Sequence, residues 1–201
     1  MYKEGYGNIA NKDKVMYYLE KAYEKTPGKW IAKAWRMGQM AEKMAEDLDL
    51  DPDIAFACGA LARLSDAYGK DLFGSLKAYE ILRADSYFFP ARIAITRAFP
   101  LKTTEDVKGD AKDLEFVEKF LYKYDYNDYD YLIQYLDFLV GEEDLGLDKD
   151  FSLKDEANPR LWERVEELDE YFRNKLKEPI DTYMPRTKRY KFPYKLFPKD
   201  R

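Results

Sequence analysis

Apolar residues recur at helical spacing along most of this chain. Val15, Leu19 and Ala22 are three and four residues apart, which places them on one face of a helix over residues 11–25. Residues 28–50 carry a broader apolar face with the same period. The pattern predicts further helices over residues 51–69, 71–83, 87–98, 111–123, 127–140 and 158–176. We therefore expect an all-α bundle of about seven to nine helices.

Local signals mark where this bundle begins and ends. Asp51 followed by Pro52 places a side-chain acceptor at a helix N-cap and proline in the first turn, which is a strong start signal. Residues 141–157 are acidic and lack a clear period, which predicts a loop. The last residues mix prolines with aromatic and basic side chains, so we expect an extended tail. The predicted organisation is one helical domain, residues 1–185, and a basic tail, residues 186–201.

The composition of the chain indicates the cellular compartment in which the protein works. Apolar residues make up 46% of the chain and charged residues 36%, with a mean hydropathy of −0.67. No apolar run reaches the roughly 18 residues of a membrane span, and the first residues do not form the apolar segment of a secretory signal. Cys58 is the only cysteine, so the chain has no internal disulfide. These features indicate a cytoplasmic protein that does not bind a membrane.

Charge is distributed unevenly between the body and the tail. The formal net charge of −5 argues against a nucleic-acid partner, because such proteins bind by neutralising phosphates. Residues 186–201 contain seven Lys or Arg and one Asp, a net +6, so the remainder carries −11. The tail either packs as a strap on the acidic body or presents its aromatic residues to a protein partner. The oligomeric state is left open.

Histidine is absent from the sequence. Histidine is the usual general base near neutral pH and a common metal ligand, so Ser-His-Asp and Cys-His nucleophile systems are excluded. A single cysteine also excludes a thiolate zinc site. Carboxylate, Lys, Arg, Tyr and Ser side chains are left to carry any chemistry. Cys58 lies inside an apolar helix and is expected to be a small buried hydrophobic residue.

Three segments in order resemble the small HD-domain metal-dependent phosphohydrolases. They are "WIAKAWRMGQMAEKMAEDLDLDPDIAFACGALARLSDAYG", "DLFGSLKAYEILRADSYFFPARIAITRAFPLK" and "YDYNDYDYLIQYLDFLVG", and the resemblance covers roughly residues 10–185. It implies an all-helical fold, a central pocket and a divalent-metal site. The family's ligands would fall on Lys33, Ala62, Arg63, Phe73 or Gly74, Arg97 and Asp137. Only Asp137 is a residue of the family's ligand type at its position.

The other ligand positions are altered while their frame is kept. Lys33, Arg63 and Arg97 would bring three positive charges to the same pocket, where they would repel a divalent ion. We therefore expect no metal and no cofactor. Large or polar side chains also stand beside the expected site, namely Trp35, Asp66, Tyr68 and Phe73. The loss of every histidine from this frame favours an engineered or computationally redesigned protein, with a natural pseudoenzyme as the alternative.

Several functions remain open for such a frame. In one, the site is a remodelled pocket for a small-molecule ligand, anionic or aromatic, in which Lys33, Arg63 and Arg97 bind an anion directly. Trp35, Tyr68 and Phe73 then form the pocket walls. In another, the cations pair with Asp66 and Asp137 and simply fill the vacated site. Three further alternatives are a retained metal-dependent phosphohydrolase, a protein-interaction module, and an enzyme that uses a desolvated Lys33 as an amine nucleophile.

Overall fold

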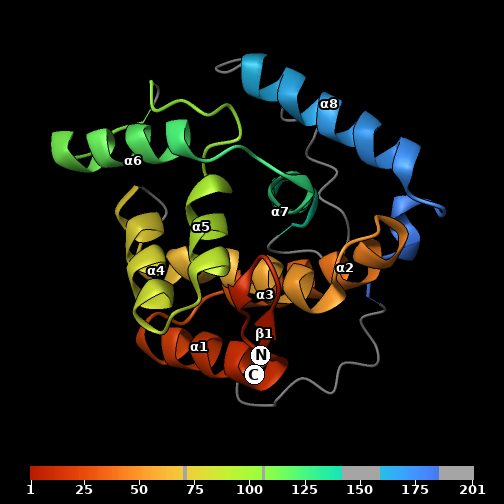
Figure 1. The fold of residues 1–201 in the computed structure, drawn as a ribbon, viewed down its shortest axis with the longest axis horizontal. Helices are drawn as coiled ribbons and strands as arrows, with labels where there is room; N and C mark the ends of the chain where they lie inside the picture. The colour runs from red at the N-terminus through yellow and green to blue at the C-terminus, as the bar shows by residue number, and fades with distance from the viewer. Residues whose placement is uncertain (70–71, 106, 142–158, 186–201) are drawn as a thin grey trace.

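Eight α-helices make up most of the computed structural model, which describes residues 1–69, 72–105, 107–141 and 159–185 (Figure 1). They are α1 (Lys12–Lys25), α2 (Trp30–Asp47), α3 (Pro52–Ala62), α4 (Leu72–Ala84), α5 (Phe88–Thr96), α6 (Ala111–Lys123), α7 (Asp128–Leu139) and α8 (Pro159–Lys175). Two short 3-10 helices, η1 (Arg63–Ala67) and η3 (Ile180–Thr182), complete the helical elements of these residues. The predicted all-α fold is confirmed.

Side-chain caps fix the helix starts that lead into the site. The Asp51 carboxylate accepts hydrogen bonds from the backbone N–H groups of Asp53 and Ile54, at 2.9 and 3.3 Å, and Pro52 occupies the first turn. At the start of α7, Asn127 and Asp130 form a reciprocal capping box. Because each cap satisfies backbone donors that have no partner inside the helix, α3 and α7 start at defined residues.

The core is built around α3, whose residues Ile54–Ala62 are all buried. It packs against α2, and two glycines allow the helix backbones to come close. A Cβ atom added at Gly59 would lie 2.8 Å from the backbone oxygen of Met37, and one added at Gly38 would lie 2.9 Å from the Cβ of Ala60. These two glycines therefore set the distance between α2 and α3.

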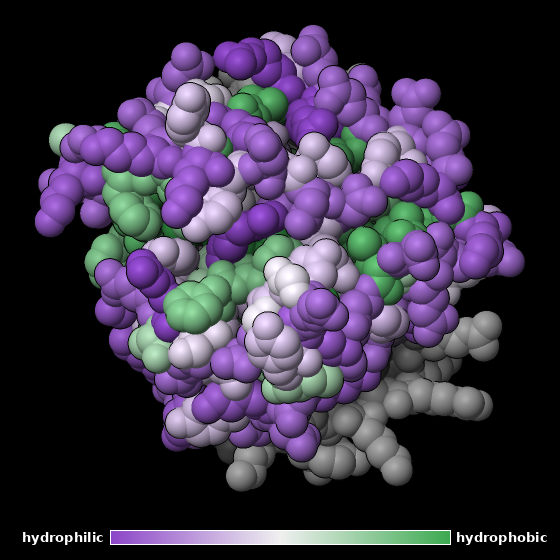
Figure 2. All heavy atoms as spheres, in the orientation of Figure 1, coloured by the Kyte–Doolittle hydropathy of each residue, from purple (hydrophilic) through white to green (hydrophobic). Residues whose placement is uncertain are grey.

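The remaining helices surround this pair (Figure 1). In that view α1 lies below α2 and α3, α4 and α5 stand side by side, and α6 and α8 lie above. Helix α7 contacts α2, α3, α5 and α8. Side chains from α2, η1 and the end of α5 reach one end of α7, and the candidate site lies at this junction. The face drawn in Figure 2 is mostly hydrophilic, with separate hydrophobic patches.

Some local features differ from the sequence-based expectations. Strands β1 (Tyr2–Lys3) and β2 (Gly7–Asn8) form an antiparallel hairpin that the helical pattern does not predict. The predicted helix over residues 51–69 ends at Ala62 and continues as η1. The remaining predictions, a loop over residues 141–157 and a basic tail over 186–201, lie almost wholly outside the described residues.

Candidate functional site

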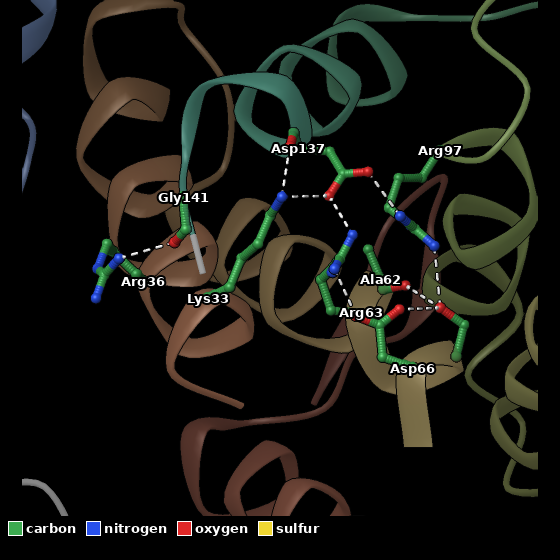
Figure 3. Close-up of polar contacts among 9 residues, drawn as sticks. Lys33, Arg36, Ala62, Arg63, Asp66, Arg97, Asp137 and Gly141 are labelled. Atoms are coloured by element: carbon green, nitrogen blue, oxygen red, sulfur yellow. Dashed lines mark hydrogen bonds and ion pairs between the residues drawn. The ribbon is translucent and has the colours of Figure 1, made fainter. Parts of the chain in front are cut away.

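Residues from three separate parts of the fold converge on the carboxylate of Asp137, near the end of α7 (Figure 3). Arg97, immediately after α5, donates from Nη1 to Oδ2 at 2.6 Å. Arg63, the first residue of η1, donates from Nη1 to Oδ1 at 2.9 Å. Lys33 of α2 lies with Nζ 3.5 Å from Oδ1 and donates to the Asp137 backbone oxygen at 2.7 Å. We call Lys33, Arg63, Asp66, Arg97 and Asp137 the central cluster.

Further hydrogen bonds fix the two guanidinium groups. Arg63 Nη2 lies 2.5 Å from Asp66 Oδ2, so the Arg63 guanidinium bridges two carboxylates. Arg97 Nη2 donates to Ser65 Oγ at 3.0 Å, and Ser65 Oγ lies 3.3 Å from Asp66 Oδ1. Each arginine is therefore held at two points, which restricts its rotamers and orients its charge toward Asp137.

The local sequence explains why η1 presents these groups. After Ala62 the chain tightens into a 3-10 helix, in which residues three apart lie on the same side. Arg63 and Asp66 are three apart, so they face each other and form their ion pair. Ala62 itself, the last residue of α3, is fully buried.

Burial and charge shift the protonation equilibria within the cluster. Burial alone would raise the pKa of Asp137, but Arg97, Arg63 and Lys33 outweigh it and hold this pKa well below the usual value. The pKa of Lys33 is lowered, chiefly because the amine is buried, with Arg63 and Arg97 adding to the shift and Asp137 opposing it. Three cations face two carboxylates in this cluster, which leaves one positive charge in excess.

The other predicted site residues lie apart from this network. Trp35 is two positions from Lys33 on α2, hence on a different face, and packs edge-on against Phe56 with ring centroids 5.0 Å apart. The ring of Tyr68 lies 4.8 Å from Lys25 Nζ. Phe73 is 60% exposed, so the structure does not bring it into the cluster as a pocket wall.

The only cysteine has no access to the surface. Cys58 is fully buried in α3, and burial raises the pKa of its thiol well above the usual value. A thiol in this state carries little thiolate, which is the reactive form. The expected role as a small buried hydrophobic residue is confirmed.

The donor set does not fit a divalent metal ion. Both oxygens of Asp137 accept from cations, and a divalent ion about 4 Å from one such cation would be repelled by roughly 8 kcal/mol at an effective dielectric near 20. Within the described ranges, no three Asp, Glu or Cys side chains gather as a metal-binding group. No metal-dependent step can be derived from these residues.

Sequence reasoning missed a second buried polar cluster beside the first. Asp130 of α7 is fully buried, pairs with Arg92 of α5 and accepts a hydrogen bond from Thr96 Oγ1 at 2.6 Å. Gln134 Nε2 donates to the Thr96 backbone oxygen at 2.9 Å. The Asn127-x-x-Asp130 spacing of a capping box is the one signal in the sequence that could have singled out Asp130.

Comparison of this chain with protein-family models, with curated proteins and with solved structures finds no match. The relationship to HD-domain hydrolases therefore stays a prediction. No helix among the described residues combines the length and the apolar character needed to cross a bilayer.

Proposed function

We propose that this chain is a non-catalytic helical scaffold related to HD-domain hydrolases, in which an internal ion-pair network occupies the position of the metal centre. The observation that carries this proposal is the state of Asp137. The residue that matches the family's last metal ligand is engaged on both carboxylate oxygens by arginines. A scaffold of this kind acts through the surfaces that it presents rather than by turning over a phosphate ester.

The convergence of the predicted ligand positions supports the relationship. Lys33, Arg63, Arg97 and Asp137 are four of the six positions onto which the family's ligands fall by sequence order, and they lie in four different parts of the fold. In the fold they meet around one carboxylate, as Figure 3 shows. Four positions spread over more than a hundred residues would not be expected to meet by chance in an unrelated helical fold.

The contacts of Asp137 also favour a filled site over an anion-binding site. An anion bound by Lys33, Arg63 and Arg97 would have to replace Asp137, which is part of the same folded core and therefore present at a very high effective concentration. The carboxylate is already held at 2.6 and 2.9 Å by the two arginines. The ion pairs thus support a structural role for the cluster.

A metal titration of two forms tests this proposal. The full-length protein should bind neither Mn²⁺ nor Mg²⁺ in calorimetry and should not hydrolyse p-nitrophenyl phosphate or nucleotides. The second form carries Lys33→His, Ala62→His and Arg63→Asp, which restores three family ligands beside Asp137. Mn²⁺ should raise its melting temperature if the frame is that of an HD domain. The proposal would be overturned if the unaltered chain bound Mn²⁺ and Asp137→Asn abolished that binding. This outcome does not depend on whether the restored form folds.

A second candidate function is amine catalysis, in which Lys33 forms a Schiff base with a carbonyl substrate. The lowered pKa of Lys33 favours it. Against it stands the geometry, because Nζ donates to the Asp137 backbone and lies beside its carboxylate. Borohydride trapping with an aldehyde or a diketone, followed by peptide mapping, separates the two. Modification that is confined to Lys33 supports catalysis, and an unmodified Lys33 supports the structural role.

Composition supports a proposal for the compartment and the partners of the protein. A net charge of −5 and a single buried cysteine support a cytoplasmic protein with no nucleic-acid partner. The interaction role considered for residues 186–201 falls outside the described residues. An engineered origin and a natural pseudoenzyme remain two hypotheses for the absence of histidine.

A further inference from the structure

An open groove of about 610 Å³ lies between α4, α5, α6 and the turn of the N-terminal hairpin. We call it the aromatic groove. Of the twelve described residues that line it, seven are aromatic, four are Lys or Arg, and none is Asp or Glu. None of them belongs to the central cluster, so a ligand site in this groove is independent of the role of that cluster. The volume is in the range of small-molecule sites, about 300 to 1,000 Å³.

Its wall is a continuous row of rings that runs from α4 along α6. Tyr79 lies 5.8 Å from Phe116 between ring centroids, Phe116 lies 6.1 Å from Phe120, and Phe120 lies 4.7 Å from Tyr124. Phe116 is 40% exposed, and Phe88 of α5 is 56% exposed. Figure 2 shows pale green side chains at the surface on the side where α4, α5 and α6 lie. A planar ligand that covered these rings would remove apolar surface from water.

Two of the four cations in the groove already have carboxylate partners. Arg92 pairs with the buried Asp130, and its guanidinium lies 4.9 Å from the ring centroid of Phe89, so it forms part of the floor. Lys119 pairs with Glu115 at 2.6 Å. These two side chains are therefore poor candidates for binding an external anion.

The contacts that the described residues give the other two cations, Arg83 and Lys123, are with aromatic side chains, and the Arg83 guanidinium lies 5.7 Å from the ring centroid of Tyr79. Arg83 Nη1 donates to the Tyr79 hydroxyl at 3.0 Å, which holds the guanidinium beside the wall. Lys123 Nζ lies 5.2 Å from the ring centroid of Tyr124. Both charges are thus held over aromatic rings at the groove, in a protein whose net charge is negative. This is a local positive potential next to an apolar wall.

We infer that the aromatic groove binds a small planar aromatic anion, such as an aromatic carboxylate, sulfonate or phosphate. The ring of the ligand packs on the exposed rings of Phe88 and Phe116, and its acidic group pairs with Arg83 or Lys123. An aliphatic anion lacks the ring contacts, and a neutral aromatic molecule lacks the ion pair. Both classes therefore bind more weakly than the ligand that has the two features together.

Fluorescence titration with two matched probes tests the inference on the full-length protein. Anilinonaphthalene sulfonate carries the ring system and the charge, and N-phenylnaphthylamine carries the ring system alone. The charge variant is Arg83→Gln with Lys123→Gln. Its control is Lys21→Gln with Lys43→Gln. This variant also removes two positive charges, but from exposed positions on α1 and α2 that lie outside the groove. The wall variant is Phe88→Ala with Phe116→Ala, and circular dichroism checks that every form is folded.

The sulfonate should bind the unaltered protein about tenfold more tightly than the neutral probe, and this preference should decrease as salt is added. The charge variant should lose about tenfold in affinity for the sulfonate and keep its affinity for the neutral probe. The control variant should match the unaltered protein, and the wall variant should lose affinity for both probes. Equal affinity for the two probes, or a charge variant that binds the sulfonate as before, would overturn the inference.

Discussion

Arg97 and Asp137 lie 40 residues apart in the sequence and are joined by a hydrogen bond of 2.6 Å between Nη1 and Oδ2. This bond connects the end of α5 to α7. Arg63 and Lys33 bring η1 and α2 to the same carboxylate. Asp137 therefore joins α7 to three other parts of the fold, and its negative charge is what allows three cations to be buried together.

Replacing Asp137 with asparagine should strongly destabilise the fold. The substitution keeps the size of the side chain but removes the charge that compensates Lys33, Arg63 and Arg97. Breaking a buried ion pair in this way costs about 3–5 kcal/mol, because the remaining charges stay in a poorly solvated place. Urea unfolding at neutral pH measures the change.

The matched control is Asp125→Asn. Asp125 is fully exposed and lies 3.4 Å from Lys102, which is a surface ion pair. Its loss should change the free energy of unfolding by less than about 1 kcal/mol. If Asp137→Asn costs no more than this control, the cluster does not stabilise the fold.

The stabilising effect of Asp137 should disappear in acid. Its folded pKa lies below the usual value of 3.8, so in the window between the two the unfolded chain holds more protons. Stability then rises with pH through that window, and the contribution is complete above about pH 4 and is lost as the pH falls below it. Urea midpoints of the unaltered protein and Asp137→Asn should therefore converge as the pH falls, and a constant difference would contradict this account.

Lys33→Met should be tolerated, in contrast to Asp137→Asn. The cluster has one more cation than carboxylates, and removing Lys33 balances it while keeping a side chain of similar length. We expect a change within about 1 kcal/mol, or a gain, because burying an unneeded charge is costly. A loss of more than about 2 kcal/mol would show that the hydrogen bond from Nζ to the Asp137 backbone is essential.

The same variant should alter the alkaline pH profile. The folded pKa of Lys33 lies below 10.5, so between the two values the unfolded chain holds more protons. The contribution of Lys33 to stability therefore rises with pH in this window. Relative to the unaltered protein, Lys33→Met should be most stable near neutral pH and should lose this advantage toward pH 10.5. Paired unfolding curves across this range measure the difference.

Much of the helical layout follows from the sequence because it depends on local signals. The Asp51-Pro52 start lies where the capping pattern predicts it. The N-terminal hairpin was missed because strands of two residues are too short to show a period. It is held instead by long-range contacts, such as that of Lys3 with Asp51 and Asp53.

The site was only partly predictable. The resemblance places Lys33, Arg63, Arg97 and Asp137 at one site, and the structure brings them together in space. The hydrogen bond from Arg97 to Ser65 depends on the tight turn of η1, which no period in the sequence predicts. The aromatic groove was missed for a similar reason, because its rings come from three helices and a hairpin whose relative positions are a property of tertiary packing.

The contact between α2 and α3 provides the last prediction. Gly59→Ala should destabilise the protein by about 1–3 kcal/mol, because the new Cβ would lie 2.8 Å from the Met37 backbone oxygen and α2 would have to move. Gly109→Ala is the control, since the atom nearest to its Cβ would be the end of the Leu72 side chain, at 2.6 Å, with Leu114 at an ordinary contact distance of 3.6 Å. The end of a side chain shifts at lower cost than a backbone atom, so we expect a smaller change, below about 1 kcal/mol. Thermal unfolding of both variants compares them, and equal melting temperatures would mean that α2 and α3 separate easily.

Since α2 carries Lys33 and α3 leads into Arg63, a shift of these helices should also weaken the central cluster, and Gly59→Ala should reduce the cost of a subsequent Asp137→Asn.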